Sequence, residues 1–349
     1  MVVESKAMNR RIADIAKVSV SNCPCCGSAA RRYLFDVHEH EYDNTTSDGF
    51  PMQECTTCGA WYLDPRPAES TLNLIYPSNY YAYVLDSKEP AATDVQQHRS
   101  SFQQRVGVKT AAKRYAPVLR HMQLAAQTRW LDVGCGNGQT LDWLRALHGF
   151  SGVGLDLSEN AVRHCKARGF EAYVGRFEEW QAPPEVGLFD VVHSSHVIEH
   201  VVSPRQYMEK AFQLLKPGGL AVFMTPNTDT ADAKFFGKNW GGLHAPRHWA
   251  LLNRRSAKQL CESTGFEYLG DYFSHNPFFW LWSCHSVAEN SLGRPVADAL
   301  FPSDHKAINS GLFMIARLAA FTFVDLAVIG ATGRSGNMLC IARKPLSAS

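Results

Sequence analysis

The sequence carries little net charge and no visible signal for export. Its 349 residues include 35 Lys and Arg against 33 Asp and Glu, which gives a formal net charge of +2. So weak a charge supplies no field that would draw the chain to nucleic acid or to an anionic membrane. The stretch Met1–Val20 contains Glu4, Arg10, Arg11 and Asp14 and lacks the apolar core of a signal peptide. These absences predict a cytoplasmic protein that does not bind nucleic acid.

Without an export signal, disulfide bonds are not expected, yet cysteines gather near the N-terminus. Two Cys-x-x-Cys pairs, Cys23–Cys26 and Cys55–Cys58, are each followed by a glycine. Such pairs, separated by a short β-like segment, are typical of a zinc ribbon in which Cys23, Cys26, Cys55 and Cys58 bind one Zn²⁺. Cys25 is left over, and four protein ligands leave no position for water, so the predicted zinc is structural. The alternative is a set of buried or disulfide-bonded cysteines.

The most informative run lies further along the chain, at Trp130–Gly138, which reads Trp-Leu-Asp-Val-Gly-Cys-Gly-Asn-Gly. A short apolar strand followed by a glycine turn and a helical pattern lets a nucleotide-like ligand lie against backbone amides. A second strand ends at Asp156 about twenty residues later, where a carboxylate can hold ribose hydroxyls. The two segments together predict binding of an adenosine-containing cofactor.

The glycine spacing also bears on which cofactor binds. The turn reads G-x-G-x-G, and Asp132 precedes it; a carboxylate there would repel a pyrophosphate but favour a cationic amino-acid ligand. Together with Phe189–His200 and Leu215–Asn227, the run resembles the motifs of class I S-adenosylmethionine-dependent methyltransferases, over about residues 105–344. The N-terminal knuckles and the segment after them, Ala60–Tyr81, resemble a subfamily of bacterial methyltransferases that begin with a zinc ribbon. These are common in natural-product and surface-polysaccharide pathways, and some methylate nucleotide-linked deoxysugars on carbon.

The order of the segments predicts an α/β fold: a Rossmann-like, mostly parallel sheet of seven strands with helices on both faces. The expected strands are 129–134, 152–156, 171–174, 188–193, 219–225, 266–273 and 336–343. The expected units are an N-terminal arm (1–20), a zinc ribbon with an extension (21–85), a polar linker (86–100), the methyltransferase core (101–275), an apolar helical segment (276–335) and the last strand with the tail (336–349).

The apolar helical segment contains the runs Pro277–Trp282 and Gly311–Gly330. Arg317 and Asp325 interrupt the second run, which argues against a membrane-spanning helix. We interpret the segment as a cap over the substrate pocket. The alternatives are a peripheral contact with a membrane or lipid-linked substrate through residues 277–330, and the interface of a homodimer.

The resemblance implies roles for residues around the cofactor. Asp132, Gly134 and Gly136 would face its methionine end, Asp156 would hold the ribose, and Leu157 would pack on the adenine. Phe177 would present its backbone amide and ring edge to the adenine, and Ser195 and His196 would lie along the cofactor. Arg176 stands where the family commonly has an acid, which puts the contact to the adenine amino group in doubt.

Methyl transfer to a hydroxyl or an acidic carbon also requires removal of a proton. The candidate bases are Glu199 and His200, expected on the helix after the fourth strand, and the cluster around His244 and His248. We favour His248 as the base and His244 second, because histidine titrates near neutrality; packing or helix capping by His248 is the alternative. Glu199 and His200 have two alternative roles: binding a divalent metal, as some quinone-pathway O-methyltransferases do, or fixing the loop that carries Asn227. Adjacent residues on a helix face different ways, which argues against the metal.

The expected function is therefore methyl transfer from S-adenosyl-L-methionine to a small or lipid-linked metabolite (sugar, polyketide or quinone-like), by in-line displacement with a histidine base. The alternative is a non-catalytic scaffold or binding protein that kept the cofactor fold, which the departure at Arg176 favours. RNA methylation is not expected, since the ribbon loop His38–Asp48 contains acids and no Lys or Arg.

Overall fold

The computed structural model describes residues 15–42, 44–77, 80, 101–302 and 312–346. Most of the expected N-terminal arm and all of the expected linker at 86–100 lie outside the described residues. The N-terminal elements are β1 (Lys17–Val18), β2 (Arg31–Val37), β3 (Phe50–Cys55), β4 (Trp61–Leu63), β5 (Arg66–Pro67), η1 (Glu69–Thr71) and α1 (Leu72–Ile75). The elements of the core are α4 (Ser101–Tyr115), η2 (Val118–Arg120), β6 (Trp130–Val133), α5 (Gln139–His148), β7 (Val153–Asp156), α6 (Glu159–Ala167), β8 (Glu171–Val174), η3 (Pro184–Val186), β9 (Phe189–Ser195), α7 (Pro204–Leu214), β10 (Leu215–Pro226), α8 (Ala231–Phe236), η4 (Gly237–Asn239), η5 (Gly241–Leu243), β11 (Ala250–Leu251), α9 (Arg254–Ser263) and β12 (Glu267–Ser274). After them come α10 (Pro277–Leu292), α11 (Arg294–Leu300), α13 (Leu312–Thr332) and β13 (Asn337–Arg343).

A seven-stranded sheet in the order β12-β13-β10-β9-β6-β7-β8 forms the centre of the core. Neighbouring strands from β10 to β8 run parallel, and β13 runs antiparallel to both β10 and β12. Each strand corresponds to one expected from the sequence, so the mostly parallel α/β fold is confirmed. β10 begins four residues before its expected start, because Leu215 already pairs with Phe189 of β9.

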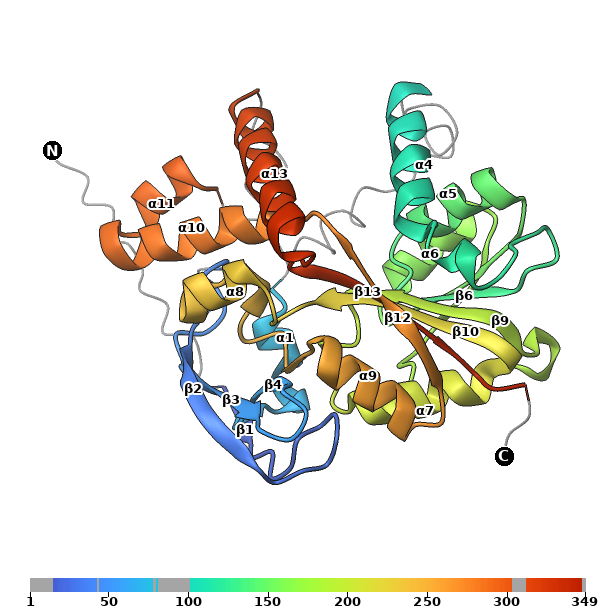
Figure 1. Cartoon of the computed structure of the whole chain (residues 1–349), viewed down its shortest axis with the longest axis horizontal. Helices are drawn as coiled ribbons and strands as arrows, with labels where there is room; N and C mark the ends of the chain where they lie inside the picture. Colours follow the sequence, from blue (N-terminus) through green and yellow to red (C-terminus); the bar gives the residue numbers. More distant parts are fainter. Residues whose placement is uncertain (1–14, 43, 78–79, 81–100, 303–311, 347–349) are drawn as a thin grey trace, which may run out of the picture.

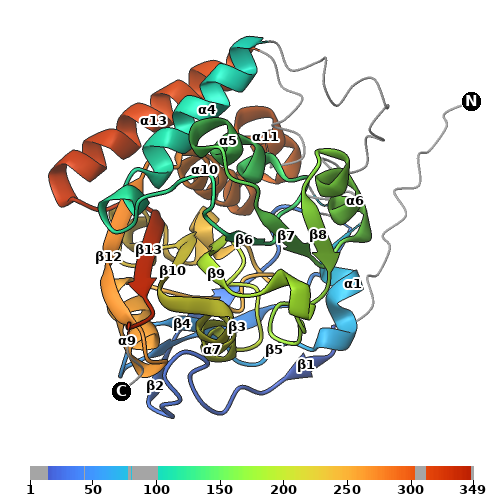
Figure 2. The ribbon, with the colours of Figure 1, turned by 90° about the vertical axis from the view of Figure 1, so that its right-hand side faces the viewer.

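Helices cover the sheet on both faces, as Figures 1 and 2 show. α4, α5 and α6 lie on one face, where Trp130, Leu141 and Val162 belong to one buried apolar cluster. α7 and α9 lie on the other face, where Met208 and Leu260 belong to a second cluster. Burial on both faces explains why β6, β10 and β13 are mostly apolar rather than alternating in pattern.

Short polar signals set where the core helices begin. The Ser203 side chain accepts a hydrogen bond from Gln206 N, and Pro204 occupies the first turn of α7, which fixes the start of that helix at Pro204. The expectation that Glu199 and His200 lie on this helix is therefore wrong. Both residues lie in the turn that precedes it.

The N-terminal unit is joined to the core through a shared sheet. β11, which comes from the core part of the chain, pairs with β4 and completes a four-stranded sheet in the order β11-β4-β3-β2. Near this junction the Asn253 side chain, which caps α9, donates from Nδ2 to the carbonyl oxygen of Gly59 at 2.8 Å. The cysteine-bearing unit is thus hydrogen-bonded to the chain segment that follows His244–Trp249.

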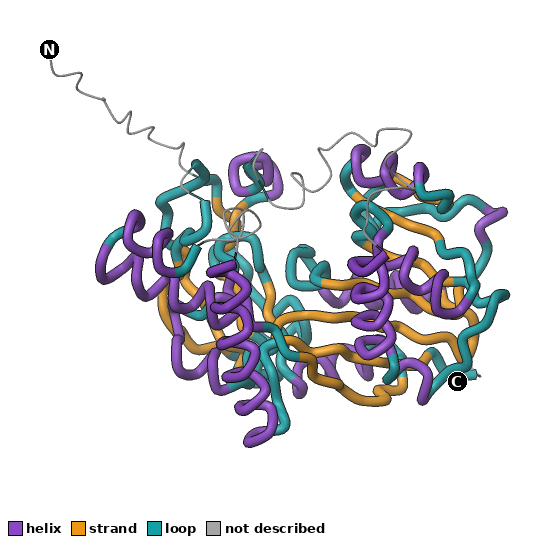
Figure 3. The backbone as a smooth tube through the Cα atoms, turned by 90° about the horizontal axis from the view of Figure 1, so that it is seen from above, coloured by secondary structure: helices purple, strands orange, loops and turns teal. Residues whose placement is uncertain are grey.

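The apolar segment after β12 contains the helices α10, α11 and α13. In Figure 1, α10 and α11 lie toward one end of the longest axis and α4–α6 toward the other, with α13 between them. Figure 3 shows the molecule from above, with helices on either side of the strands. Asp325 of α13 is buried, and its carboxylate accepts hydrogen bonds from Asn276 N at 2.6 Å and Trp280 Nε1 at 3.1 Å. These bonds explain how a charge is tolerated inside an apolar helix. Among the residues that the structure describes, no helix combines the length and apolar character needed to span a membrane.

Candidate functional site

The glycine turn between β6 and α5 has the backbone conformation that its sequence predicts. Gly134, Gly136 and Gly138 have φ angles of +69°, +50° and +76°, a region that other residues rarely adopt. A side chain at position 134 would also lack room, because its Cβ would lie 2.5 Å from Cγ2 of Val197. Gly136 N donates to Oδ2 of Asp156 at 2.9 Å, so the turn and the end of β7 are held together.

The turn forms part of the wall of a cavity of about 700 Å³, a size typical of sites for small ligands. Burial raises the pKa of Asp156, whose carboxylate accepts hydrogen bonds from Gly136 N and Ser158 N. The residues expected to contact the cofactor that line this cavity are Gly134, Gly136, Asp156, Leu157, Phe177, Ser195 and His196.

Asp132 is the one expected cofactor residue that does not line the cavity. It is buried, and its Oδ1 lies 2.7 Å from Nδ1 of His193, whose Nε2 lies 3.0 Å from the hydroxyl of Tyr115. Side chains alternate along a strand, so Asp132 shares the face of Trp130 toward α4, opposite to Leu131 and Val133. The sequence could not show this orientation, because both faces of β6 are buried.

The N-terminal extension supplies a wall of the cavity that the sequence analysis did not assign. Its lining residues, to which we refer as the α1 wall, are Leu72, Asn73, Tyr76 and Tyr80. The rings of Tyr76 and Tyr80 meet edge to face with centroids 5.0 Å apart. α1 ends at Ile75, so Tyr76 and Tyr80 lie beyond it, and helical spacing in the sequence could not have identified this wall. None of the described residues from 276 to 335 lines this cavity, so the part of the expected cap that the structure describes does not form its wall.

His200 is the expected catalytic residue that lines the cavity. Its Nδ1 lies 2.9 Å from the hydroxyl of Tyr76 and 3.1 Å from the carbonyl oxygen of Arg247. A carbonyl oxygen only accepts, so the hydrogen of the neutral ring sits on Nδ1 and Nε2 keeps a lone pair. Burial lowers the pKa of His200 to about 4, which keeps the ring neutral at pH 7.

His248 and His244 lie behind His200 and do not line the cavity. His248 is buried, and its Nδ1 lies 2.9 Å from the carbonyl oxygen of Gly242. Burial holds the pKa of His248 well below its usual value. His244 places Nδ1 2.5 Å from Oε1 of Glu41 and accepts a hydrogen bond at Nε2 from Arg247 Nε at 2.9 Å. Both nitrogens of His244 are therefore engaged, and the bond from Nδ1 to Glu41 joins the core to the N-terminal unit.

Glu199 is fully buried beside these rings. Its Oε1 lies 3.0 Å from Nδ1 of His196, and its Oε2 accepts a hydrogen bond from the Thr225 hydroxyl at 3.2 Å. Glu199, His200 and His248 each place one potential ligand atom within 4.8 Å of the others. Since Glu199 and His200 lie in a turn, the helical argument against a shared metal does not apply to them.

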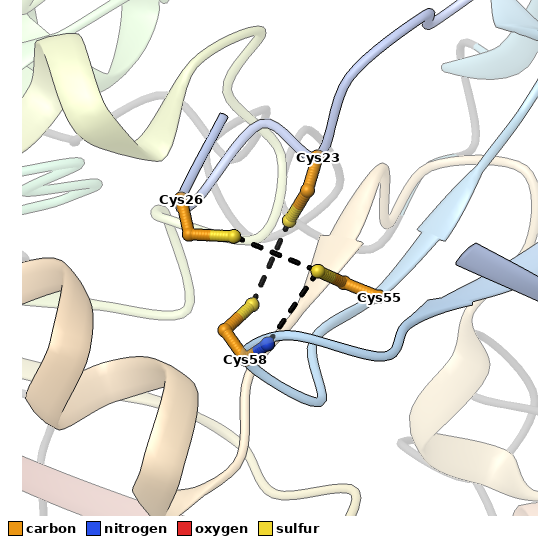
Figure 4. A group of neighbouring side chains, drawn as sticks. All are labelled: Cys23, Cys26, Cys55 and Cys58. Atoms are coloured by element: carbon orange, nitrogen blue, oxygen red, sulfur yellow. Dashed lines mark hydrogen bonds between the residues drawn. The ribbon is translucent and has the colours of Figure 1, made fainter. Parts of the chain in front are cut away.

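The four cysteines expected to bind zinc form a compact group, with their side chains directed toward one another (Figure 4). The Sγ atoms of Cys23 and Cys58 are 3.6 Å apart, and those of Cys26 and Cys55 are 3.5 Å apart. Tetrahedral zinc with bonds of about 2.3 Å requires sulfur atoms roughly 3.8 Å apart, so the donor set fits a zinc ion closely. Cys25 is buried next to this group and is not one of the four.

Comparison with known proteins shows the family to which the chain belongs. A family model described as a methyltransferase domain matches residues 98–270. A ubiquinone biosynthesis O-methyltransferase from Ruegeria pomeroyi is 30% identical over 177 residues, which cover 45% of this chain and 68% of that protein. A probable S-adenosylmethionine-dependent methyltransferase from Mycolicibacterium smegmatis is 31% identical over 137 residues, covering 39% of this chain and 51% of that protein. The chain belongs to the class I S-adenosylmethionine-dependent methyltransferases.

The similarity has a limited extent. The chain spans about half the length of the first curated relatives that it matches, 51% and 46% for the first two. Among solved structures, the geranyl diphosphate C-methyltransferase of Streptomyces coelicolor A3(2) is 12% identical, with a TM-score of 0.42, covering 67% of this chain and 76% of that chain. Such a score supports no conclusion about the acceptor.

Proposed function

We propose that the protein transfers the methyl group of S-adenosyl-L-methionine to a hydroxyl or an acidic carbon of a small or lipid-linked metabolite. The observation that carries this proposal is a single cavity that contains both the glycine turn with Asp156 and the α1 wall with His200. A methyl donor and an acceptor can therefore lie in contact, which methyl transfer requires.

In the proposed reaction the acceptor oxygen or carbon attacks the methyl carbon as the bond from that carbon to sulfur breaks. The products are S-adenosyl-L-homocysteine, the methylated acceptor and one proton. We assign the proton to Nε2 of His200, because this residue lines the cavity and its neutral ring keeps a lone pair there. His248 and His244 support His200 from behind, with ring centroids 4.6 Å apart for His200 and His248.

The acceptor end of the cavity favours a bulky, largely apolar molecule. Its aromatic and aliphatic lining side chains are Leu72, Tyr76, Tyr80, Val201 and Trp249, and the polar ones beside them are Asn73 and His200. Apolar and aromatic walls with few polar groups exclude water from the cavity and orient a ring-bearing acceptor. A sugar, polyketide or quinone-like acceptor linked to a larger carrier is compatible with this wall.

Two metal ions enter the proposal in different ways. Cys23, Cys26, Cys55 and Cys58 would hold a structural Zn²⁺ that fixes the N-terminal unit. Glu199, His200 and His248 would hold a divalent cation if one binds beside the cavity, where it would polarise an acceptor oxygen. Metal analysis of the purified protein separates the two cases, since one equivalent of zinc supports only the cysteine site.

The test is methyl transfer from isotope-labelled S-adenosyl-L-methionine to a panel of phenolic, sugar-nucleotide and polyketide acceptors. The proposal expects product with at least one class, and a fall of about 10²–10⁴-fold for His200→Gln, the range for loss of a general base. Unchanged turnover in His200→Gln would remove this residue from the proton step. Cofactor binding without transfer to any acceptor would favour a binding or scaffold role.

A further inference from the structure

Arg176, the residue at which the sequence departs from its family, pairs with the N-terminal extension. Its Nη1 lies 2.6 Å from Oε2 of Glu69, although 107 positions separate the two residues in the chain. We propose that Arg176 and Glu69 form a latch that holds the α1 wall against the cofactor end of the cavity. This inference rests on the proposed function, since it assumes that the cavity binds S-adenosylmethionine.

The latch joins two parts of the same cavity. Arg176 lines the cavity beside Gly175 and Phe177, in the turn expected to contact the adenine. Glu69 opens η1, which runs directly into α1 and so precedes Leu72, the first residue of the α1 wall. A displacement of Glu69 therefore moves the surface that would contact the acceptor. Arg176 thus acts as a positioning residue for both ligands.

The segment from Glu69 to Ile75, which carries the first part of the α1 wall, is held at its two ends by contacts of different kinds. At its far end, Arg247 donates from Nη1 to the carbonyl oxygen of Ile75 at 3.0 Å, and the Arg247 side chain is fully buried. At its near end, the side chains of Arg176 and Glu69 are 31% and 44% exposed. An exposed ion pair is weak and opens readily in water. The near end is therefore the part of the wall that can open and close while the far end stays anchored.

Arg66 supplies a third charge next to the latch, so removing Glu69 and removing Arg176 should have effects of different size. Arg66 lies with Cζ 4.4 Å from the ring centroid of Trp249, which lines the cavity. Burial lowers the pKa of Arg66; the charge of Arg176 acts in the same direction and that of Glu69 opposes it. Glu69 thus offsets two guanidinium groups. After its removal, Arg176 keeps, among the described residues, only the pair of its Nε with Glu179, at 3.7 Å and on a side chain that is 77% exposed, and it repels Arg66. Removal of Arg176 instead leaves Glu69 beside Arg66.

The test measures the dissociation of S-adenosyl-L-homocysteine from the full-length, zinc-loaded protein by stopped flow. The variants are Glu69→Gln, Arg176→Gln and the double variant. Arg205→Gln is the matched control, because Arg205 and Glu209 form an ion pair of similar exposure, 43% and 46%, on α7 and away from the cavity lining. The latch predicts dissociation about two- to five-fold faster in the single variants, with the larger effect for Glu69→Gln.

The double variant identifies the cause. If the residues act through each other, the double variant dissociates no faster than Glu69→Gln, and high salt brings the wild type toward the variants. Additive effects would overturn the latch and assign Arg176 a direct contact with the cofactor. Variants that match wild type and Arg205→Gln would overturn it too. If the wild type binds no ligand at millimolar concentration, the proposed function fails first, which separates the two failures.

Discussion

Arg247 and Glu39 form a buried ion pair that joins the methyltransferase core to the N-terminal unit. Nη1 and Nη2 of Arg247 lie 2.5 Å and 2.8 Å from the two carboxylate oxygens of Glu39, and the side chains are 0% and 2% exposed. Burial alone would lower the pKa of Arg247, but the charge and hydrogen bonds of Glu39 raise it above its usual value. The guanidinium also lies over the ring of Tyr42. Removal of one partner strands the other charge away from water, which costs about 3–5 kcal/mol in buried pairs.

Arg247→Met should therefore lower the free energy of unfolding by about 3–5 kcal/mol, seen as a fall in the urea midpoint on the order of 1 M. Adding Glu39→Gln should restore part of the loss, because the carboxylate that Arg247 pairs with most closely is then neutral. The loss is not restored in full, because Glu41, whose Oε2 lies 3.9 Å from Nη2 of Arg247, loses the guanidinium and keeps its contact with His244. Lys258→Gln, which removes an exposed partner of Glu262, is the control and should change stability by less than about 0.5 kcal/mol. A loss below about 1 kcal/mol in Arg247→Met, or a double variant as unstable as the summed singles, would refute this account of the junction.

Three further predictions concern the metal, the histidine and the turn. Cys58→Ser, or a chelator that extracts zinc, should melt the N-terminal unit before the core, seen as loss of amide protection in β2–β4 with β6 and β9 still protected. Because the pKa of His200 falls from 6.5 to about 4 on folding, the unfolded chain takes up a proton first as the solution is acidified. Protonation at His200 should then lower stability by up to about 3 kcal/mol between pH 6.5 and 4. His200→Gln should reduce the slope in this region of a urea-denaturation series without removing it, because burial also lowers the pKa of His248. Gly134→Ala should abolish binding of S-adenosyl-L-homocysteine in calorimetry, because its φ of +69° and the contact with Val197 both oppose a side chain.

The sequence predicts the features that depend on neighbouring residues. The strand at Trp130–Val133, the glycine turn after it and the acid at Asp156 are local patterns, and the structure has each of them at its expected place. The cysteine pairs likewise predict their own convergence, because each knuckle brings two thiols together.

Contacts between distant segments leave no such pattern in a single sequence. Tyr76 meets His200 across 124 positions and Arg247 meets Glu39 across 208 positions, and the sequence alone specifies neither pairing. The same limit explains why the sequence analysis favoured His248 over His200 as the base. His248 has the residue type that a base requires, but the fold buries it behind His200, which lines the cavity.

The account depends most directly on cofactor binding in the cavity bounded by the glycine turn and Asp156. We would titrate the zinc-loaded protein with S-adenosyl-L-homocysteine by calorimetry, beside Asp156→Ala and the surface control Glu209→Gln. The account predicts saturable binding by wild type and Glu209→Gln and loss of binding in Asp156→Ala with the fold retained. Folded wild type that binds nothing at millimolar ligand, or Asp156→Ala that binds as tightly as wild type, would contradict it.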